Sequence, residues 1–242
     1  MLAAVALVNG FSLKSRPESV GLPAPPVRPD GLYAGPTAAP ASLGALLGPY
    51  FRSPAFRLML VLSFSLTALR EAFSFWVPTY LVEAAHLSAG AAARYSALYS
   101  LGGVASILGA GYLSDGWLRG RRGGLLLAGS AALVPVLLLM ARPASGSAGP
   151  LVLISLVGLS LLGPYSFLAG AMSLDAGGRR GAATASGLVD AVGYVGGTRA
   201  LWLMGWGPAF LALALLAAGT AGAALVFYRT QEQPPAGGPG GA

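Results

Sequence analysis

Two charged residues, Arg70 and Glu71, lie near the middle of an apolar stretch that runs from residue 56 to residue 81. An ionisable group inside a membrane span is costly, so it marks a substrate or ion path by default. The alternative is a structural ion pair within a helix bundle. Because adjacent residues of a helix point about 100° apart, we expect Arg70 and Glu71 to find separate partners rather than each other.

The same stretch continues toward its C-terminal end with Trp76 and Tyr80. Aromatic residues of these types are enriched where a spanning helix meets the membrane surface, and this role accounts fully for Tyr80. Trp76 lies deeper, where a side chain can form the wall of a cavity. Both residues are retained, with Arg70 and Glu71, as candidates for substrate binding.

Asp190 lies inside a later apolar stretch, and Tyr194 follows one turn further on the same helix face. A hydrogen bond from the tyrosine hydroxyl would make Asp190 a satisfied core group. The alternative is a part in proton coupling. Arg199, near the outer end of this stretch, is expected to extend its charge to the membrane surface.

A set of glycine, acidic and basic residues separates two other apolar stretches: Gly111, Asp115, Gly120, Arg121 and Arg122. The glycines allow close helix contact and a tight turn. Asp115 can accept hydrogen bonds at a helix terminus or pair with a loop arginine. The spacing is specific as a signature, and its chemistry predicts a structural latch rather than a binding site.

The sequence has no Cys and one His. This composition excludes disulfides, thiolate metal sites and Cys nucleophiles, and it makes a His-based metal site unexpected. Ser, His and Asp never occur in a triad-like arrangement, and no nucleic-acid motif is found. We therefore predict no enzymatic activity, no cofactor, no metal and no nucleic-acid partner.

The composition indicates which elements hold these residues. Of 242 residues, 55% are apolar and 10% are charged, whereas a soluble domain has about 25% charged residues. A helix that spans a bilayer needs roughly 20 mostly uncharged residues. We predict an all-α membrane protein with six spans, at residues 56–81, 91–113, 124–141, 150–174, 182–204 and 208–228.

The segments outside the spans differ in character. Residues 1–13 are typical of the end of a truncated preceding helix. Residues 14–55 contain nine of the 18 prolines and are predicted to form a cytoplasmic Pro-rich linker. We expect a six-helix transmembrane domain at 56–228 and a disordered cytoplasmic tail at 229–242, where proline and glycine predominate.

The basic residues predict an orientation. Eleven of those in the loops or near the span ends fall on one side, and two, Arg94 and Arg142, fall on the other. Loops rich in Lys and Arg stay in the cytoplasm. We therefore predict cytoplasmic termini, and the same distribution accounts for the net charge of +7.

Several segments resemble a known group of transporters. The segment from Gly111 to Arg122 is similar to the loop signature of the major facilitator superfamily, as it recurs in the C-terminal half. Residues 69–81 resemble the seventh helix of the organophosphate:phosphate antiporters, the family of the glycerol-3-phosphate and hexose-phosphate transporters. Further similarity to helices ten and eleven and to the central loop of this family lies in residues 163–165, 173–175, 183–187, 193–197 and 16–23.

The resemblance implies half of a major facilitator fold, with six transmembrane helices arranged as two inverted three-helix repeats. It also implies that Arg70 is one of two arginines that hold the substrate phosphate. The other would come from a missing N-terminal six-helix half, encoded upstream or as a separate chain. A guanidinium suits this role because it offers paired donors to phosphate and stays charged. Phe75 and Ser100 stand where the family's studied members carry acids, which leaves the substrate and the coupling ion open.

The predicted function is transport of a small organic phosphate or a related anion by alternating access, in exchange for inorganic phosphate. Sugar phosphates, glycerol-3-phosphate and phosphoglycerates are the expected substrate classes. The expected location is the cell (inner) membrane, with the lipid bilayer around the helices. Two alternatives stay open: a truncated fragment that does not transport, and a phosphate-ester sensor that acts through partners.

Overall fold

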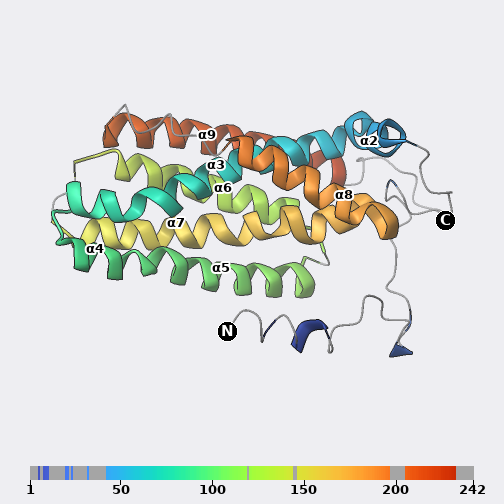
Figure 1. Ribbon diagram of the computed structural model, residues 1–242. Coiled ribbons are helices and arrows are strands. Elements are labelled where there is room, and N and C mark those ends of the chain that lie inside the picture. The colour runs from blue at the N-terminus through green and yellow to red at the C-terminus, as the bar shows by residue number, and fades with distance from the viewer. Residues whose placement is uncertain are drawn as a thin grey trace.

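The computed structural model describes residues 42–118, 120–143, 146–196 and 205–232, together with residues 5, 8–10, 20, 21, 23 and 32. The long described ranges consist of helices joined by short turns (Figure 1). The helices are α2 (Leu43–Arg52), α3 (Pro54–Glu83), α4 (Ala89–Tyr95), α5 (Ala97–Gly116), α6 (Gly123–Met140), α7 (Ala148–Phe167), η2 (Leu168–Met172), α8 (Ser173–Gly196), α9 (Trp206–Phe227) and η4 (Tyr228–Glu232).

Within the described residues, five helical stretches are long and apolar enough to cross a membrane: Pro54–Glu83, Ala89–Gly116, Gly123–Met140, Ala148–Gly178 and Trp206–Glu232. They correspond to five of the six predicted spans. The remaining prediction, residues 182–204, is covered by α8 as far as Gly196, and its last residues lie outside the described part of the chain.

Two groups of three helices, one with α3, α5 and α6 and the other with α7, α8 and α9, make equivalent packing contacts. α5 packs against α7 as α8 packs against α3, and α6 packs against α7 as α9 packs against α3. Exchanging α3, α5 and α6 with α7, α8 and α9 converts each of these contacts into its counterpart. α3 and α7 run in opposite directions (Figure 1). The predicted all-α fold, half of a facilitator fold with two inverted three-helix repeats, is therefore confirmed.

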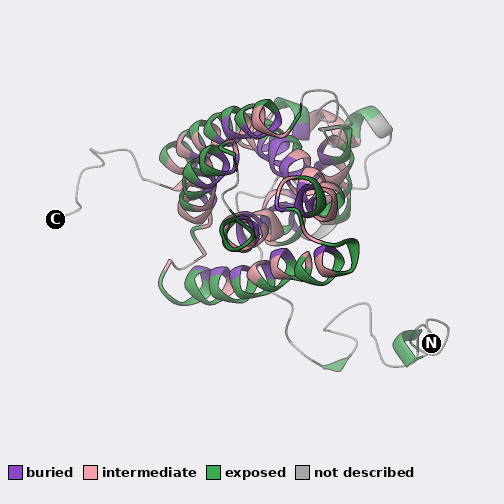
Figure 2. Cartoon of the chain, turned by 90° about the vertical axis from the view of Figure 1, so that its left-hand side faces the viewer, coloured by how far each residue is buried: buried purple, intermediate pink, exposed green. Residues whose placement is uncertain are grey.

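Buried residues face the spaces between the helices, and exposed residues face outward (Figure 2). The outward side of α5 is nevertheless apolar, with exposed side chains at Leu101, Leu108, Tyr112 and Trp117. A soluble protein would not leave such a surface in water. This side of α5 is suited to contact with lipid or with another membrane segment.

The end of the predicted linker is helical. α2 begins after Ser42, whose hydroxyl accepts a hydrogen bond from the Ala45 amide at 3.2 Å. Tyr50 is fully buried and donates its hydroxyl to the Gly181 carbonyl at 2.7 Å. This tertiary contact holds α2 on the bundle despite the high proline content of the segment. Most of the remaining linker, and most of residues 1–13, lie outside the described residues.

Helical structure also continues beyond residue 228, where the sequence predicted a disordered tail. η4 extends to Glu232, and the Thr230 hydroxyl donates to the Val226 carbonyl at 2.8 Å. The side chain of Glu232 contacts α6, as described below, and this contact anchors the segment. The rest of the predicted tail, residues 233–242, lies outside the described residues.

Candidate functional site

Arg70 lies on α3 where this helix meets α7 and α8. Its guanidinium carbon is 5.0 Å from the centre of the Tyr165 ring and 5.8 Å from the centre of the Tyr194 ring. Its Nη2 also donates to the Tyr194 hydroxyl at 3.2 Å. A cation within about 6 Å of an aromatic ring centre is attracted to the ring face. Side chains from three helices thus meet at one positive charge inside the bundle.

A close approach of α8 to α3 brings Tyr194 within reach of Arg70. A Cβ atom at Gly193 would lie 2.5 Å from Thr67 Oγ1 and 2.9 Å from Ser63 Oγ. The Ser63 hydroxyl also donates to the Val189 carbonyl on α8 at 2.7 Å. Small residues permit such approaches in lipid, where large apolar side chains gain little by meeting. The absence of a side chain at Gly193 therefore sets the position of Tyr194.

Glu71 forms an ion pair with Arg70. The prediction that these neighbours would find separate partners is therefore wrong. Their Cα–Cβ bonds diverge, but the long arginine side chain bends around the helix far enough to meet the carboxylate. The two side chains are only 23% and 14% exposed, and opposite charges attract more strongly there than in water.

The geometry leaves Arg70 able to bind a further group. A guanidinium carries five N–H donors in a planar fork, and Glu71 and Tyr194 both engage the same nitrogen, Nη2. The Nε atom is buried and has no hydrogen-bond partner among the described residues. An anion cannot reach this enclosed atom, but 23% of the side chain is exposed, and the donors on that part suit an anion with several oxygens, such as a phosphate group.

Asp190 does not join this group. The Tyr194 hydroxyl, whose bond to Asp190 was one of the two alternatives, accepts a hydrogen bond from Arg70. Within the described residues, the side chain of Asp190 makes no hydrogen bond or ion pair. The positive charge on α3 attracts the hydroxyl oxygen, and this interaction replaces the predicted contact along α8. Arg199 lies outside the described residues.

Trp76 and Tyr80 face a different place, a cleft between α3 and α9. Both line this cleft, with Phe73, Trp206 and Phe210. The ring centres of Tyr80 and Trp206 are 5.3 Å apart, and Tyr80 is buried. Positions 70 and 76 differ by about 120° around a helix. The two predicted aromatic candidates are therefore separated from Arg70.

The predicted loop signature lies where α5 leads into α6. Gly111 and Asp115 belong to the last turns of α5, and Gly120 has a φ of 80°, which favours glycine. Arg121 and Asp115 are exposed, and Asp115 pairs with none of the described residues. The expected pairing of Asp115 with a loop arginine is therefore not found in this part of the structure, because solvent surrounds the carboxylate.

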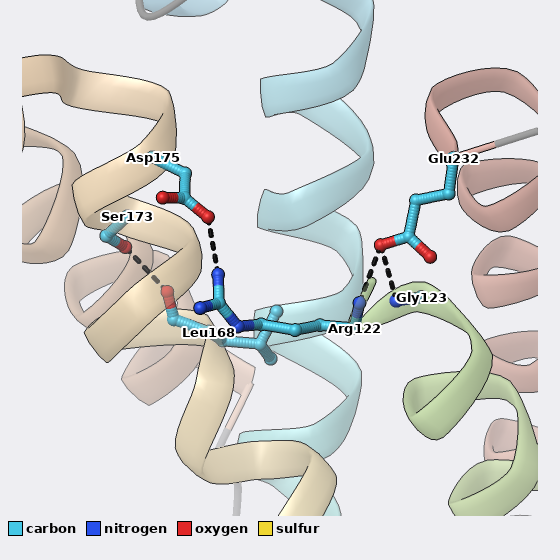
Figure 3. Close-up of polar contacts among 6 residues, drawn as sticks. All are labelled: Arg122, Gly123, Leu168, Ser173, Asp175 and Glu232. Carbon is cyan, nitrogen blue, oxygen red and sulfur yellow. Dashed lines mark hydrogen bonds and ion pairs between the residues drawn. The ribbon is translucent and has the colours of Figure 1, made fainter. Parts of the chain in front are cut away.

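Arg122 connects three helices at this end of the bundle (Figure 3). Its Nη1 donates to Asp175 on α8, and its guanidinium carbon lies 5.9 Å from the centre of the Phe167 ring. The backbone N–H groups of Arg122 and Gly123 donate to Glu232 Oε1 at 2.7 and 2.8 Å. A carboxylate here satisfies free amides at the start of α6 and complements the helix dipole. A structural latch thus exists at the loop, with Asp175 and Glu232 as its acids.

The sequence analysis did not select Tyr165, Asp175 or Glu232 as site residues. Tyr165 and Asp175 lie in segments that resemble the transporter family, so the resemblance could have singled them out. Glu232 lies in the predicted tail, and nothing in its local sequence indicates a contact with α6.

Comparison with known proteins adds evidence from sequence similarity. Residues 1–201 match the family model of the Major Facilitator Superfamily. This match includes the helices that carry Arg70, Tyr165 and Tyr194.

Three relatives are named as phosphate-ester carriers. The glycerol-3-phosphate transporter of Bacillus subtilis is 31% identical over 126 residues, which are 51% of this chain and 28% of that protein. The glycerol-3-phosphate transporter of Haemophilus influenzae is 30% identical over 148 residues, 54% of this chain and 31% of that protein. The glucose-6-phosphate exchanger SLC37A1 of Mus musculus is 30% identical over 132 residues, 51% of this chain and 24% of that protein. The chain thus matches less than a third of each relative.

Proposed function

Because the chain belongs to the Major Facilitator Superfamily, we propose that it is half of a carrier that exchanges a small organic phosphate for inorganic phosphate. It is a multi-pass integral membrane protein whose relatives are transporters, not enzymes. The proposed substrate class rests on two supports: the relatives are named for glycerol-3-phosphate and glucose-6-phosphate, and the chemistry at Arg70 suits a phosphate group.

One observation carries this proposal: two tyrosine rings fix the position of the Arg70 guanidinium, and only one of its nitrogens, Nη2, makes hydrogen bonds to the described residues. Tyr165 and Tyr194 lie against its charge, while 23% of the side chain is exposed. A charge inside a membrane bundle is retained when it has a task or a partner. Tyrosine rings fix the orientation of the planar fork, so its free donors are already arranged for a phosphate before one arrives.

Glu71 gives the proposed site its own counter-ion. Its carboxylate pairs with Arg70 when no anion is bound, so an arriving phosphate has to share the guanidinium with a second negative charge. This competition weakens substrate binding without abolishing it. A carrier benefits because binding must be strong enough to admit the substrate and weak enough to release it.

The other wall of the proposed site comes from a second six-helix half. Substrate sites in transporters built from structural repeats lie near the membrane midplane, where the repeats meet. The similarity to the phosphate-ester carriers covers less than a third of their length. We therefore propose that a preceding half closes the cavity around Arg70 and supplies a second cationic contact.

The proposed location is the cell (inner) membrane, with both chain ends in the cytoplasm. The starts of α3, α6 and α8 and the end of α9 lie at one end of the bundle (Figure 1). Arg57, Arg121, Arg122 and Arg229 lie at that end. Such an excess of basic residues favours the cytoplasmic side.

The test uses the chain joined to a matching N-terminal half, in vesicles loaded with inorganic phosphate. We expect uptake of glycerol-3-phosphate or glucose-6-phosphate by the joined protein and no uptake by the 242-residue chain alone. Arg70→Ala should weaken substrate binding about tenfold to hundredfold, since a charge-assisted contact is lost. Arg70→Lys should recover only part of this loss, because an ammonium lacks the paired geometry.

Arg94→Ala is the matched control, because Arg94 is exposed at the end of α4 and should leave binding unchanged. An Arg70→Ala protein that binds as tightly as the parent would overturn the site and favour a structural ion pair. Binding without exchange would favour the sensor. Robust uptake by the chain alone would show that no second half is needed.

A further inference from the structure

The hydroxyl of Ser106, on α5, bonds to two backbone groups of α7. It donates to the Leu159 carbonyl and accepts from the Gly163 amide at 3.0 Å. These are the groups that one turn of an α-helix would join to each other. Ser106 therefore offers both ends of this turn a partner from a neighbouring helix, and such insertions are a recognised cause of helix bending.

The next residue of α7, Pro164, alters the following turn. Proline has no amide hydrogen, so it cannot donate to the carbonyl of Ser160, four residues before it. On the opposite side, α6 makes room for the ring: a Cβ atom at Gly129 would lie 2.4 Å from Pro164 Cγ and 2.5 Å from the Ser160 oxygen. Two successive turns of α7 thus have backbone hydrogen bonding that differs from a regular helix.

A second irregularity follows at Gly170, in η2. Its φ of −88° and ψ of −109° are not helical. Residues 164–170 therefore form a short helical segment with a weakened connection at each end. Such a segment can change its angle to the helix on either side, because its two ends are the irregular points of the backbone.

This short segment carries a ring for each of two arginines. The Tyr165 ring lies against Arg70 at 5.0 Å, and the Phe167 ring lies against Arg122 at 5.9 Å. Arg70 belongs to the proposed anion site, whereas Arg122 belongs to the latch with Asp175 at the end of the bundle. Any rotation of the segment moves both rings and so changes both contacts together.

We propose that Ser106 is the pivot residue of segment 164–170, and that this segment couples anion binding at Arg70 to the Arg122 latch. The coupling rests on the proposed function, whereas the pivot is a property of the fold alone. Ser106 acts through α7 and does not touch the substrate, so it is a positioning residue. Without its hydroxyl, the Leu159 carbonyl and the Gly163 amide would lose their contact with α5, this turn of α7 would be held less firmly, and both rings would move.

The experiment is nuclear magnetic resonance of the full chain in lipid nanodiscs, with isotope-labelled arginine. A guanidinium over a ring face has its signals shifted to lower frequency by the ring current, so Arg70 and Arg122 report directly on Tyr165 and Phe167. Arg70→Lys and Arg122→Lys assign the two signals. We expect Ser106→Ala to shift both signals toward the values of exposed arginines, with no anion added.

Two further variants separate the pivot from ordinary packing. Pro164→Ala restores the missing amide and should shift the same two signals, which provides a second route if Ser106→Ala folds poorly. Ser155→Ala is the matched control, because the Ser155 hydroxyl bonds to the Leu151 carbonyl of its own helix at 2.9 Å. This control should move neither signal. Unmoved signals in both Ser106→Ala and Pro164→Ala, or equal shifts in Ser155→Ala, would overturn the pivot.

The coupling is tested by adding inorganic phosphate or glycerol-3-phosphate to the chain joined to a matching N-terminal half, the form in which the proposed anion site is complete. In the parent we expect the Arg70 and Arg122 signals to respond together, and in Ser106→Ala we expect the Arg70 signal to respond alone. A response of Arg70 without Arg122 in the parent would overturn the coupling and leave the proposed function intact. If Arg70 itself fails to respond, the proposed function fails, while the anion-free comparison still decides the pivot.

Discussion

The Tyr194 hydroxyl lies 3.2 Å from Arg70 Nη2, and this contact joins the two inverted repeats at the charged site. Arg70 belongs to the first repeat, through α3, and Tyr194 belongs to the second, through α8. Tyr165 on α7 adds another contact from the second repeat. The geometry of the proposed anion site therefore depends on how the two repeats pack against each other.

Tyr194→Phe should lower the affinity of the joined carrier for glycerol-3-phosphate by about threefold to tenfold. This is the effect expected when one net hydrogen bond is lost and the guanidinium is held less firmly. Isothermal titration calorimetry measures the change. Tyr112→Phe is the control, because Tyr112 is 75% exposed on α5. Equal affinities for Tyr194→Phe and parent would mean that the hydroxyl does not orient Arg70.

Glu71→Gln should raise the affinity for phosphate and its esters about tenfold, because the anion no longer has to share Arg70 with a carboxylate. The same titration measures it. Glu83→Gln serves as control, since Glu83 is on the same helix and accepts a hydrogen bond from Trp206 at 3.0 Å, away from Arg70. A weaker affinity in Glu71→Gln would contradict the competition and indicate that Glu71 contacts the substrate directly.

Gly193→Ala should destabilise the protein by about 1–3 kcal/mol, because the added methyl group is forced against Thr67 and Ser63 on α3. Thermal unfolding in detergent measures the loss. Gly187→Ala is a matched control on the same helix, where a Cβ atom has no neighbour within 4 Å. Equal melting temperatures for the two variants would contradict the close packing of α8 on α3.

Glu232→Ala should lower stability by about 1 kcal/mol, because two amides at the start of α6 lose their acceptor and the helix dipole loses a nearby negative charge. The same unfolding assay applies. Gln231→Ala is the control, since Gln231 is exposed and adjacent in sequence. If both variants unfold like the parent, the contact of Glu232 with α6 does not contribute to stability.

The orientation can be checked by labelling single cysteines with a membrane-impermeant reagent, because the chain has no native Cys. Ser147→Cys should react from outside intact cells, and Gln231→Cys should react only after permeabilisation. Both residues are exposed, and they lie at opposite ends of the bundle. The reverse labelling pattern would place the termini outside.

The long helices could be predicted from the sequence because spanning a bilayer requires a run of apolar residues, and a run is a local property. The choice of Arg70 had the same basis, since a charge within such a run is visible without any knowledge of packing. Contacts between helices depend on rotation and tilt, which composition does not reveal. For this reason the sequence did not separate Trp76 and Tyr80 from Arg70, although both face the cleft beside α9.

The sequence-based predictions also differ from the structure at two glutamates, whose side chains make contacts that local sequence rules do not indicate. Glu71 was expected to turn away from Arg70, but side-chain length matters more than Cβ direction when both groups are partly buried. Glu232 was assigned to a disordered tail on composition, but a single carboxylate finds two free amides at the start of α6. Neither contact leaves a periodic signal in the sequence.

The ion pair between Arg70 and Glu71 has a consequence for how the protein is made. During synthesis α3 emerges well before its later partners: Tyr194 follows Arg70 by 124 residues. In this interval a lone arginine would oppose entry of α3 into the bilayer. Glu71 is available as soon as the helix forms, so α3 can enter the membrane as a neutral segment. The adjacent carboxylate can thus neutralise Arg70 until α7 and α8 are in place.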